Sequence, residues 1–583
     1  MIKLFRHLDI KERLMVFCGI LFVMVQVWLE LKMPEYMSEI TVLIEMPGSE
    51  MSEILKNGGY MLACAVGSMI ATIATGYFAA IVSASLSLKL RSKLFRKVMS
   101  FNEEEMTHFS TASLITRTTN DITQVQMLVA MGLQIITKTP IMLIWGILKI
   151  MGKEWQWSAA TAAAVMLIVI VIMLAVFLAL PKFKIIQELT DDLNRVTREN
   201  LTGIRVIRTY NAEKYQQKKF DGANSSLTES NLFANRITAL LMPTMIFITS
   251  AISPAIYWIG AYLLEAAEMT EQVTVFSDMV VFSQYAMQVI MAFAMLTVLF
   301  VMLPRVMVSV YRINEVLDMQ VKIKDGAVSS EKCYKKGSIE FRNVSFAYPG
   351  GGNTLHNISF TANSGETVAF IGATGSGKST LVNLIPRFYD TDSGEILVDG
   401  VNIRDYTLSA LREKIGYVSQ KAVLFAGSVA SNVAFGQENV SDENMRSAVS
   451  VSQSEEFVKT MQGEFDSEIA QSGSNLSGGQ RQRLSIARAV YKDPEVYIFD
   501  DSFSALDYKT DHILMEKLAE HSKGATKLIV AQRIGTIRHA DRIIVLEDGQ
   551  IVGNGIHEKL LKNCPTYRDI AYSQLSEEEL RNE

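Results

Sequence analysis

The chain has 583 residues and a mass of 65.0 kDa, which is more than a single domain usually holds. A mean hydropathy of +0.19 and 30 methionines argue against a large soluble core and indicate sequence that lies within a membrane. The net charge of −5 and the pI near 6.0 provide no basic footprint, so nucleic acid is excluded as an expected partner.

The first 305 residues contain six apolar runs, each long enough to cross a bilayer as a helix of about 20 residues. These runs centre on Leu14–Leu31, Tyr60–Leu86, Leu128–Met151, Ala159–Leu180, Ile237–Leu264 and Val273–Leu303. We therefore predict an all-α transmembrane domain of six helices over residues 1–320.

The first run contains Gln26 and ends near Glu30, so we expect it to be the least apolar of the six. A cleaved signal peptide is the rival interpretation, but no small-residue cleavage pattern follows Leu29. The preceding residues, 1–13, mix apolar and basic side chains. They predict either a short amphipathic helix on the inner membrane surface or a solvated tail.

Charges near the ends of the runs predict the orientation, because lysine and arginine beside a span are retained in the cytoplasm. Basic residues flank the first, second and fourth runs at Lys3, Arg6, Lys11, Arg13, Lys89, Arg91, Lys93, Arg96, Lys97, Lys182 and Lys184. The intervening loops are mostly acidic, at Glu35, Glu39, Glu45, Glu50, Glu53, Glu265, Glu268 and Glu271. We predict a multi-pass protein of the bacterial plasma (inner) membrane with both termini in the cytoplasm.

Two of the predicted cytoplasmic connections, residues 87–126 and 182–236, are too long to be simple turns. Their apolar residues recur at helical spacing, which predicts long helical extensions of the spans. Such stripes need something to pack on. Either they contact the C-terminal half of the chain and couple it mechanically to the membrane, or they form a helical core of their own.

Charged and adaptable side chains inside the runs leave the cargo undefined. Lys138 and Glu30 lie in apolar sequence and would either contact cargo in a central cavity or extend to the membrane surface. The methionine, phenylalanine and alanine residues between Leu240 and Leu303 suit an adaptable cavity, and ordinary helix packing explains them equally well.

A polar linker over residues 321–337 leads into a second domain, residues 338–583, with the pattern of a soluble α/β protein. The buried-strand run Thr367–Ile371 enters the loop Gly372–Ser379, and a predicted helix follows. Backbone N–H groups of residues 374–379 can surround phosphates at a helix N-terminus. Lys378 can neutralise the β- and γ-phosphates, and the Ser379 hydroxyl can ligate magnesium. ATP and Mg²⁺ are therefore the expected cofactors.

Two further motifs follow the loop. The strand run Val496–Phe499 leads into Asp500, and Leu476–Gln480 reads Leu-Ser-Gly-Gly-Gln. With them the chain resembles an ABC exporter half-transporter, six spans followed by one nucleotide-binding domain, over nearly its whole length. The resemblance implies a P-loop ATPase domain of α/β fold with a helical subdomain, and ATP hydrolysis coupled to transport.

The resemblance also assigns roles to single residues. Tyr348 matches the aromatic residue that stacks on adenine, Gln420 the glutamine beside the magnesium or attacking water, and residues 504–507 the loop that crosses to a partner's site. Ser477 and Gly479 match the signature residues that a chain donates to its partner's ATP. The expected nucleotide-binding set is Tyr348, Thr374, Gly375, Ser376, Gly377, Lys378, Ser379, Thr380, Gln420 and Asp500, with Ser379 and Gln420 on Mg²⁺.

Three positions depart from the family pattern. Asp501 stands where ABC proteins usually have glutamate, Gln532 where they usually have histidine, and Gln471–Gly473 replaces the usual charged residues before the signature. A carboxylate retracted by about 1 Å can cost about a hundredfold in rate, and losing a general base about 10² to 10⁴. Binding of ATP should survive where its hydrolysis is impaired.

We therefore predict one half of a heterodimeric, multidrug-type exporter of amphipathic or lipophilic compounds. Its own degenerate site would hold ATP, while its signature completes the hydrolytic site of a partner that carries the glutamate and the histidine. An ATP-gated channel or sensor, and a slow homodimeric exporter of lipid or peptide, remain the alternatives.

Overall fold

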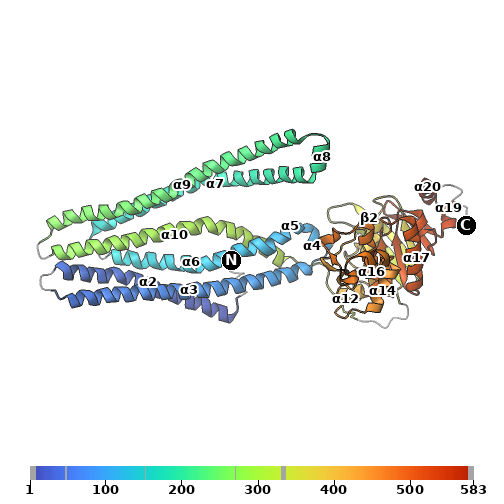
Figure 1. The fold of residues 1–583 in the computed structure, drawn as a ribbon, viewed down its shortest axis with the longest axis horizontal. Coiled ribbons are helices and arrows are strands. Elements are labelled where there is room, and N and C mark those ends of the chain that lie inside the picture. The colour runs from blue at the N-terminus through green and yellow to red at the C-terminus, as the bar shows by residue number, and fades with distance from the viewer. Residues whose placement is uncertain (1–7, 46–48, 152, 269–270, 330–335, 576–583) are drawn as a thin grey trace. The chain divides into compact units, whose positions relative to one another are not determined.

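The computed structural model describes residues 8–45, 49–151, 153–268, 271–329 and 336–575. The chain forms two compact units (Figure 1). One consists of the residues up to Met99 together with Thr111–Met319, and the other of Ser100–Ser110 together with the residues from Gln320 onward. A segment of the first predicted connection thus belongs to the second unit. Most of the tail predicted as amphipathic, and Cys333 in the linker, lie outside the described residues.

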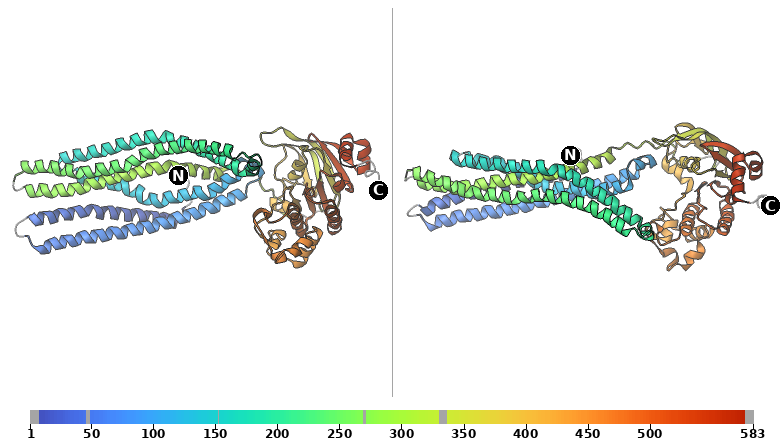
Figure 2. Two further views of the ribbon diagram at one scale, coloured as in Figure 1. Left: turned by 45° about the horizontal axis from the view of Figure 1, so that its top comes forward. Right: turned by 90° about the horizontal axis from the view of Figure 1, so that it is seen from above.

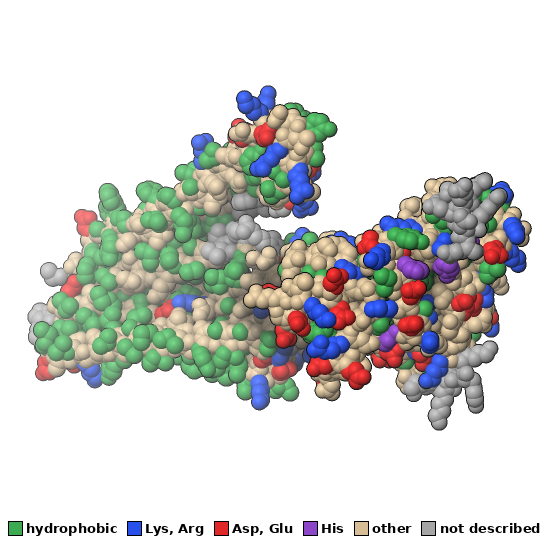
Figure 3. Space-filling model, turned by 45° about the vertical axis from the view of Figure 1, so that its right-hand side comes forward, with side chains coloured by type: hydrophobic (Ala, Val, Ile, Leu, Met, Phe, Trp, Pro, Cys, Tyr) green, Lys and Arg blue, Asp and Glu red, His purple; other side chains and the backbone are tan. Residues whose placement is uncertain are grey.

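The first unit is helical, and six of its described helices are long and apolar enough to cross a membrane. The long elements are α2 (Ile10–Glu45), α3 (Met51–Met99), α6 (Ile122–Ile150), α7 (Trp155–Thr202), α9 (Glu213–Ala266) and α10 (Gln272–Asp318). Hydrophobic side chains cover most of the visible face of these helices (Figure 3). This pattern suits lipid contact, because a surface in hydrocarbon has no water to solvate polar groups.

The expectation that the first run is the least apolar is wrong. The most apolar stretch of α2 has a mean hydropathy of 2.2, above the 1.7 of α3. Gln26 and Glu30 are single polar residues among many leucines, valines and methionines, so they barely lower the average. Gln26 is buried against neighbouring helices rather than facing lipid.

Both long connections are helical, as predicted. In the first, α3 continues to Met99 and is followed by α4 (Glu103–His108), α5 (Thr111–Thr116) and the π-turn η1 (Arg117–Asp121). In the second, α7 turns through α8 (Ile204–Thr209) into α9, and these two long helices run side by side (Figure 2). They form a hairpin with an exposed tip.

Helix α4 is anchored within the second unit. The buried Glu105 accepts hydrogen bonds from the backbone N–H of Asn102 at 2.9 Å and from that of Lys322 at 3.0 Å. The Lys322 ammonium also pairs with Glu104. The first connection therefore contributes a packed element to the unit that contains the predicted ATPase.

The second unit is built on two sheets. The antiparallel sheet has the order β2-β1-β4-β5, from β1 (Ile339–Ala347), β2 (Asn353–Ala362), β4 (Ser393–Val398) and β5 (Val401–Asn402). The larger sheet has the order β12-β11-β3-β10-β9-β6. Its strands are β3 (Thr367–Ile371), β6 (Ile415–Val418), β9 (Val496–Asp500), β10 (Thr526–Val530), β11 (Arg542–Glu547) and β12 (Gln550–Gly555).

The five strands β11, β3, β10, β9 and β6 are parallel, and only the edge strand β12 is antiparallel. Side chains of β9 alternate between two cores, with Tyr497 and Phe499 in one and Val496 and Ile498 in the other. A parallel sheet covered on both faces gives such near-continuous apolar strands.

Besides α4, ten α-helices accompany the two sheets among the described residues of this unit. They are α11 (Lys378–Leu384), α12 (Leu408–Glu413), α13 (Val429–Val433), α14 (Asp442–Val451), α15 (Glu455–Thr460), α16 (Gly478–Lys492), α17 (Tyr508–His521), α18 (Ile534–Ile537), α19 (His557–Asn563) and α20 (Pro565–Gln574). The two-residue strands β7 (Gly427–Ser428) and β8 (Glu468–Ile469) pair beside α13.

Candidate functional site

The parallel sheet brings the predicted site residues to one edge. The strands β3, β6, β9 and β10 all end there, and the registers align Val530 with both Asp500 and Phe370. Ligands of open α/β sheets bind at the carboxyl ends of such strands. The Gly-rich loop, Gln420, Asp500, Asp501 and Gln532 each follow or end one of them.

The loop Gly372–Ser379 has a conformation in which its backbone N–H groups can face a ligand. Gly375 and Gly377 have φ angles of +87° and +95°, in the left-handed region that favours glycine. A Cβ on Gly377 would lie 2.7 Å from Leu355 Cδ2 and 3.1 Å from the Thr354 carbonyl oxygen. Helix α11 begins at Lys378, so the loop presents N–H groups at a helix N-terminus, which suits a phosphate.

Lys378 points back into this loop. Its ammonium donates to the carbonyl oxygens of Gly372 at 2.8 Å and Ala373 at 2.7 Å, and to Ser376 Oγ at 3.3 Å. Burial lowers the pKa of Lys378, and the negative charges of Asp501 and Asp500 oppose that effect. The cation is held where phosphate oxygens can replace carbonyl oxygens as its partners.

Of the two side chains expected on magnesium, Ser379 contacts Asp500, whereas Gln420 binds the neighbouring Asp501. Ser379 Oγ donates to Asp500 Oδ1 at 2.7 Å, joining the start of α11 to the end of β9. Burial raises the pKa of Asp500, and the hydrogen bond from Ser379 partly offsets this. A hydroxyl and a carboxylate at hydrogen-bond distance form the oxygen donor set that Mg²⁺ prefers beside a nucleotide.

Two of the three departures from the family pattern, Asp501 and Gln532, contact each other. Gln532 Nε2 donates to Asp501 Oδ2 at 2.8 Å, and Gln420 Nε2 donates to the same oxygen at 3.1 Å. Asp501 is 8% exposed and has a φ of +47°, a conformation that aspartate tolerates better than most residues. Burial raises the pKa of Asp501, and these hydrogen bonds oppose it.

Tyr348 is fixed beside the loop. Its hydroxyl shares a hydrogen bond of 3.1 Å with Thr380 Oγ1 of α11, and its ring meets Tyr389 edge to face at a centroid distance of 5.2 Å. The ring is only partly buried. This arrangement leaves room for the predicted stacking on a base.

The signature Leu476–Gln480 forms the start of α16. Ser477 is the N-cap: its side chain accepts from the Gln480 N–H at 3.3 Å, while Gln480 Oε1 accepts from the Ser477 N–H at 2.9 Å. Ser477 and Gly478 are exposed, and a Cβ on Gly478 would meet nothing within 4 Å. A helix N-terminus is thus presented to solvent, with its charge complementary to an anion.

The atypical residues Gln471–Gly473 form a short 3-10 turn before the signature. Ser472 has a φ of +58°, and the Gly473 carbonyl oxygen accepts from Arg481 of α16 at 3.3 Å. The segment is therefore tied to the signature helix by backbone geometry and one arginine rather than by the charged residues usual in the family.

Three further residues belong to the site but were not predicted from the sequence. Arg533 donates to the carbonyl oxygens of Leu506 at 3.0 Å and Ser504 at 3.1 Å, which holds the predicted crossing loop. Tyr417 donates to Asn383 Oδ1 at 2.8 Å and lies near Asp500. The third, Gln574, lies on α20. Arg533 is adjacent to Gln532 in sequence, whereas Tyr417 and Gln574 carry no sequence signal.

Gln574 binds the segment that carries Gln532. Its Nε2 donates to the Gln532 carbonyl oxygen at 2.7 Å, and its Oε1 accepts from the Ile534 N–H at 2.8 Å. One amide side chain therefore bridges the backbone on both sides of Arg533.

In the membrane unit, Glu30 and Lys138 form an ion pair of 2.9 Å. Glu30 Oε1 also accepts from Gln26 at 2.8 Å and from Ser68 at 3.3 Å. The two charges thus satisfy each other between α2 and α6.

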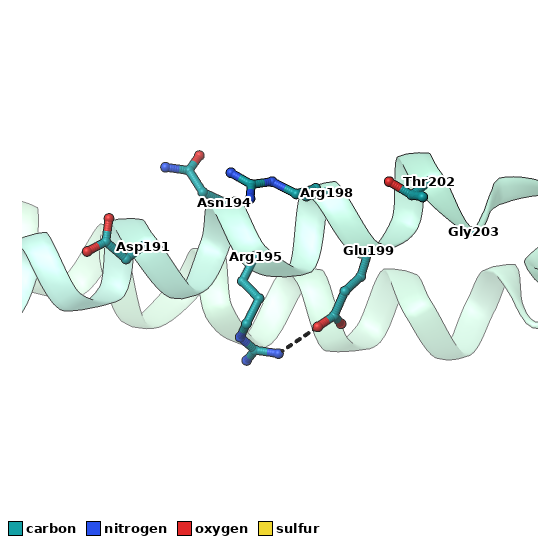
Figure 4. A pocket seen from close by; sticks show the side chains of 7 residues that line it. All are labelled: Asp191, Asn194, Arg195, Arg198, Glu199, Thr202 and Gly203. Carbon is teal, nitrogen blue, oxygen red and sulfur yellow. Dashed lines mark hydrogen bonds and ion pairs between the residues drawn. The ribbon is translucent and has the colours of Figure 1, made fainter. Parts of the chain in front are cut away.

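A hollow of about 670 Å³ lies on the extension of α7, away from these residues (Figure 4). It is lined by Asp191, Asn194, Arg195, Arg198, Glu199, Thr202 and Gly203. Arg195 bonds Glu199 at 3.0 Å and also contacts Asp192. The charged residues of the lining carry no net charge, and Arg195 pairs with Glu199 on an exposed helix face.

Comparison with known proteins identifies both units. Residues 16–302 match the family model "ABC transporter transmembrane region", and residues 355–504 match "ABC transporter". A Mycobacterium tuberculosis protein described as an uncharacterized ABC transporter ATP-binding protein is 37% identical over 528 residues, 89% of each chain. An ATP-dependent lipid A-core flippase of Pseudomonas aeruginosa is 32% identical over 504 residues, 86% of this chain and 82% of that protein.

The fold is similar to that of a solved structure, a bacterial Atm1-family ABC exporter with ATP bound. The TM-score is 0.80 at 22% identity, over 97% of this chain and 99% of that chain.

Proposed function

This chain belongs to the ABC transporter family, as an exporter half-transporter with a transmembrane region fused to an ATPase domain, and from this premise we propose that it is the degenerate-site subunit of a heterodimeric exporter. In this proposal it retains ATP at its own loop and donates its signature to the hydrolytic site of a different half. The cargo is an amphipathic or lipophilic compound.

The observation that most supports the proposal is the hydrogen bonding of the Asp501 carboxylate. Both Gln420 and Gln532 donate to one oxygen of its carboxylate. A general base must accept a proton from a positioned water, and the two amide N–H groups compete with that water for Oδ2 of Asp501. Glutamine at position 532 offers no proton-transfer chemistry near neutral pH, unlike the histidine of the family pattern.

The groups that bind nucleotide are intact beside this weakened centre. Lys378 and the loop N–H groups suit phosphates, Ser379 and Asp500 suit magnesium, and Tyr348 suits a base. Bound magnesium would stabilise charge on the γ-phosphoryl group, while this chain's own residues position it. Strong binding combined with poor proton transfer favours retention of ATP over turnover.

Two exposed surfaces support the proposal that a partner chain binds. The signature end of α16 is open to solvent at Ser477. The tip of the α7–α9 hairpin exposes Leu201, Val206, Tyr210 and Tyr215, each at 60% or more. Exposed apolar side chains clustered at a helical tip are typical of an interaction site.

The test is a turnover structure of the complex purified from its native host with this chain tagged. We expect a second half-transporter with glutamate and histidine at the two divergent positions. We also expect an intact triphosphate beside Asp501 and hydrolysis products opposite Ser477. The reverse arrangement, or a homodimer that hydrolyses ATP at a rate typical of transporters, would overturn the proposal.

A further inference from the structure

A pocket of about 480 Å³ lies between α2 and α6, near the end of the membrane unit where α6 connects to α7. Its lining residues are Trp28, Leu31, Lys32, Glu35, Trp145, Leu148 and Lys149. We propose that this pocket binds the anionic headgroup of an amphiphile, a phosphate or carboxylate attached to an apolar tail.

The charge of the pocket favours an anion. Lys32 binds Glu35 Oε2 at 2.5 Å, and Lys149 binds Glu35 Oε1, so two ammonium groups share one carboxylate. The lining therefore carries a net charge of +1. Each ammonium has three N–H donors, and the two oxygens of Glu35 cannot satisfy six. An anionic headgroup supplies the acceptors that the pocket lacks.

The walls suit an amphiphile rather than a free ion. Trp28 is 51% exposed and Leu148 is 61% exposed, and both flank the lysines. Lys149 lies one residue before the end of α6, at the depth where tryptophan and lysine mark the membrane–water interface. A headgroup on the lysines would leave its tail along Trp28 and Leu148, within hydrocarbon.

A second ion pair on the same two helices provides the comparison. Lys138 lies 11 residues before Lys149 on α6, about 16 Å along the helix axis. It forms an ion pair with Glu30, so the two charges cancel. Glu30 Oε1 also accepts hydrogen bonds from Gln26 and Ser68, so this carboxylate oxygen has three donors. The pocket near the end of α6 combines surplus positive charge with a cavity, whereas the charges of the Lys138–Glu30 pair cancel.

Two sources can supply this chemistry: a phospholipid of the surrounding membrane, or an acidic amphiphile that the transporter moves. In the second case the inference deepens the proposed function and rests on it. Headgroup binding itself needs neither ATP nor a partner, so a binding experiment can fail or succeed independently of the ATP-site experiment.

The experiment uses the full chain in phosphatidylcholine nanodiscs. Phosphatidylglycerol or phosphatidylcholine with brominated acyl chains is added, and quenching of tryptophan fluorescence is measured. Trp28→Phe/Trp145→Phe identifies the signal from the pocket. Lys32→Gln/Lys149→Gln removes its charge, Lys32→Arg/Lys149→Arg retains it, and Lys138→Gln is the matched control.

We expect the brominated phosphatidylglycerol to be preferred roughly fivefold, the effect of about one net basic charge. The preference should vanish in Lys32→Gln/Lys149→Gln and persist in the arginine variant and in Lys138→Gln. Relief of quenching by dodecyl phosphate would assign the site to an exchanging amphiphile. No relief, with the preference retained, would assign it to membrane lipid. Equal quenching by both lipids, or a preference that survives loss of both lysines, would overturn the inference.

Discussion

Asp501 is the residue on which the proposed separation of ATP binding from ATP hydrolysis depends. Its carboxylate is buried, accepts from two glutamines, and lies next to Asp500, whose contact with Ser379 is intact. In the proposed function, the carboxylate expected at the metal and the altered base position are adjacent residues at the end of one strand. Substitution at one can therefore alter hydrolysis while leaving nucleotide binding unchanged.

Restoring both family residues should restore hydrolysis at this site. We expect Asp501→Glu/Gln532→His to raise phosphate release by roughly 10²-fold or more, because a longer carboxylate and an imidazole return base and proton-transfer function. Asp501→Asn, the control, should leave ATP affinity and the already slow release nearly unchanged. A large loss of release in Asp501→Asn would instead show that Asp501 works as a base.

Lys378 should determine affinity. We expect Lys378→Met to weaken ATP binding roughly 10- to 150-fold in calorimetric titration, because a charge-assisted contact to phosphate is lost. Lys527→Met is the matched control, since Lys527 is also a buried lysine, with backbone carbonyl oxygens as its hydrogen-bond acceptors, but outside the site. Equal losses in both variants would indicate unfolding rather than a role in phosphate binding.

At the scale of elements, α20 contacts the backbone of the candidate site through Gln574. The side chain of Gln574 forms hydrogen bonds with the backbone of Gln532 and Ile534, and the side chain of Gln532 donates a hydrogen bond to Asp501. The helix is itself anchored by the buried Tyr567, whose hydroxyl shares a hydrogen bond of 2.7 Å with His557 Nδ1. The C-terminal helix therefore positions the loop after β10.

We expect Gln574→Leu to speed hydrogen exchange of the Ile534 amide roughly fivefold, because that N–H loses its acceptor. Dissociation of ATP from the chain should accelerate as the Gln532 contact loosens. Ser573→Ala is the control, because the neighbouring serine only bonds the Ile570 carbonyl oxygen on its own helix. Unchanged exchange at Ile534 in Gln574→Leu would contradict this role.

Sequence alone could predict the elements whose pattern lies within a single segment of the chain. The six apolar runs, the strand before Gly372 and the strand that leads into Asp500 each carry their own pattern, and the structure confirms them as helices or strands. Contacts between distant residues could not be predicted. Gln574 lies 42 positions from Gln532, and an exposed glutamine near a helix end has no pattern that indicates a tether. The shared acceptor on Asp501 likewise depends on which neighbouring strands end together.

For the whole molecule, the open signature predicts a division of labour between two chains. In the co-purified complex we expect Ser477→Arg to reduce ATP hydrolysis by about 10² to 10³, since a donor to the partner's γ-phosphate is lost. ATP bound beside Asp501 should be retained. Ser474→Arg, three residues earlier and also exposed, should have little effect. Normal hydrolysis in Ser477→Arg would show that the signature serves no partner site.

The placement of α4 bears on how this protein can be cut for study. A fragment that starts at Gln320 would omit Glu105, the acceptor for the Lys322 N–H, and would expose a surface that the intact chain covers with residues 100–110. Expressed by itself, such a fragment is expected to aggregate and to have a lower melting temperature than the same unit in the intact chain. Supplying residues 100–110 as a separate peptide should raise the melting temperature of the fragment. The unit that contains the ATPase is therefore built from two segments that are distant in sequence.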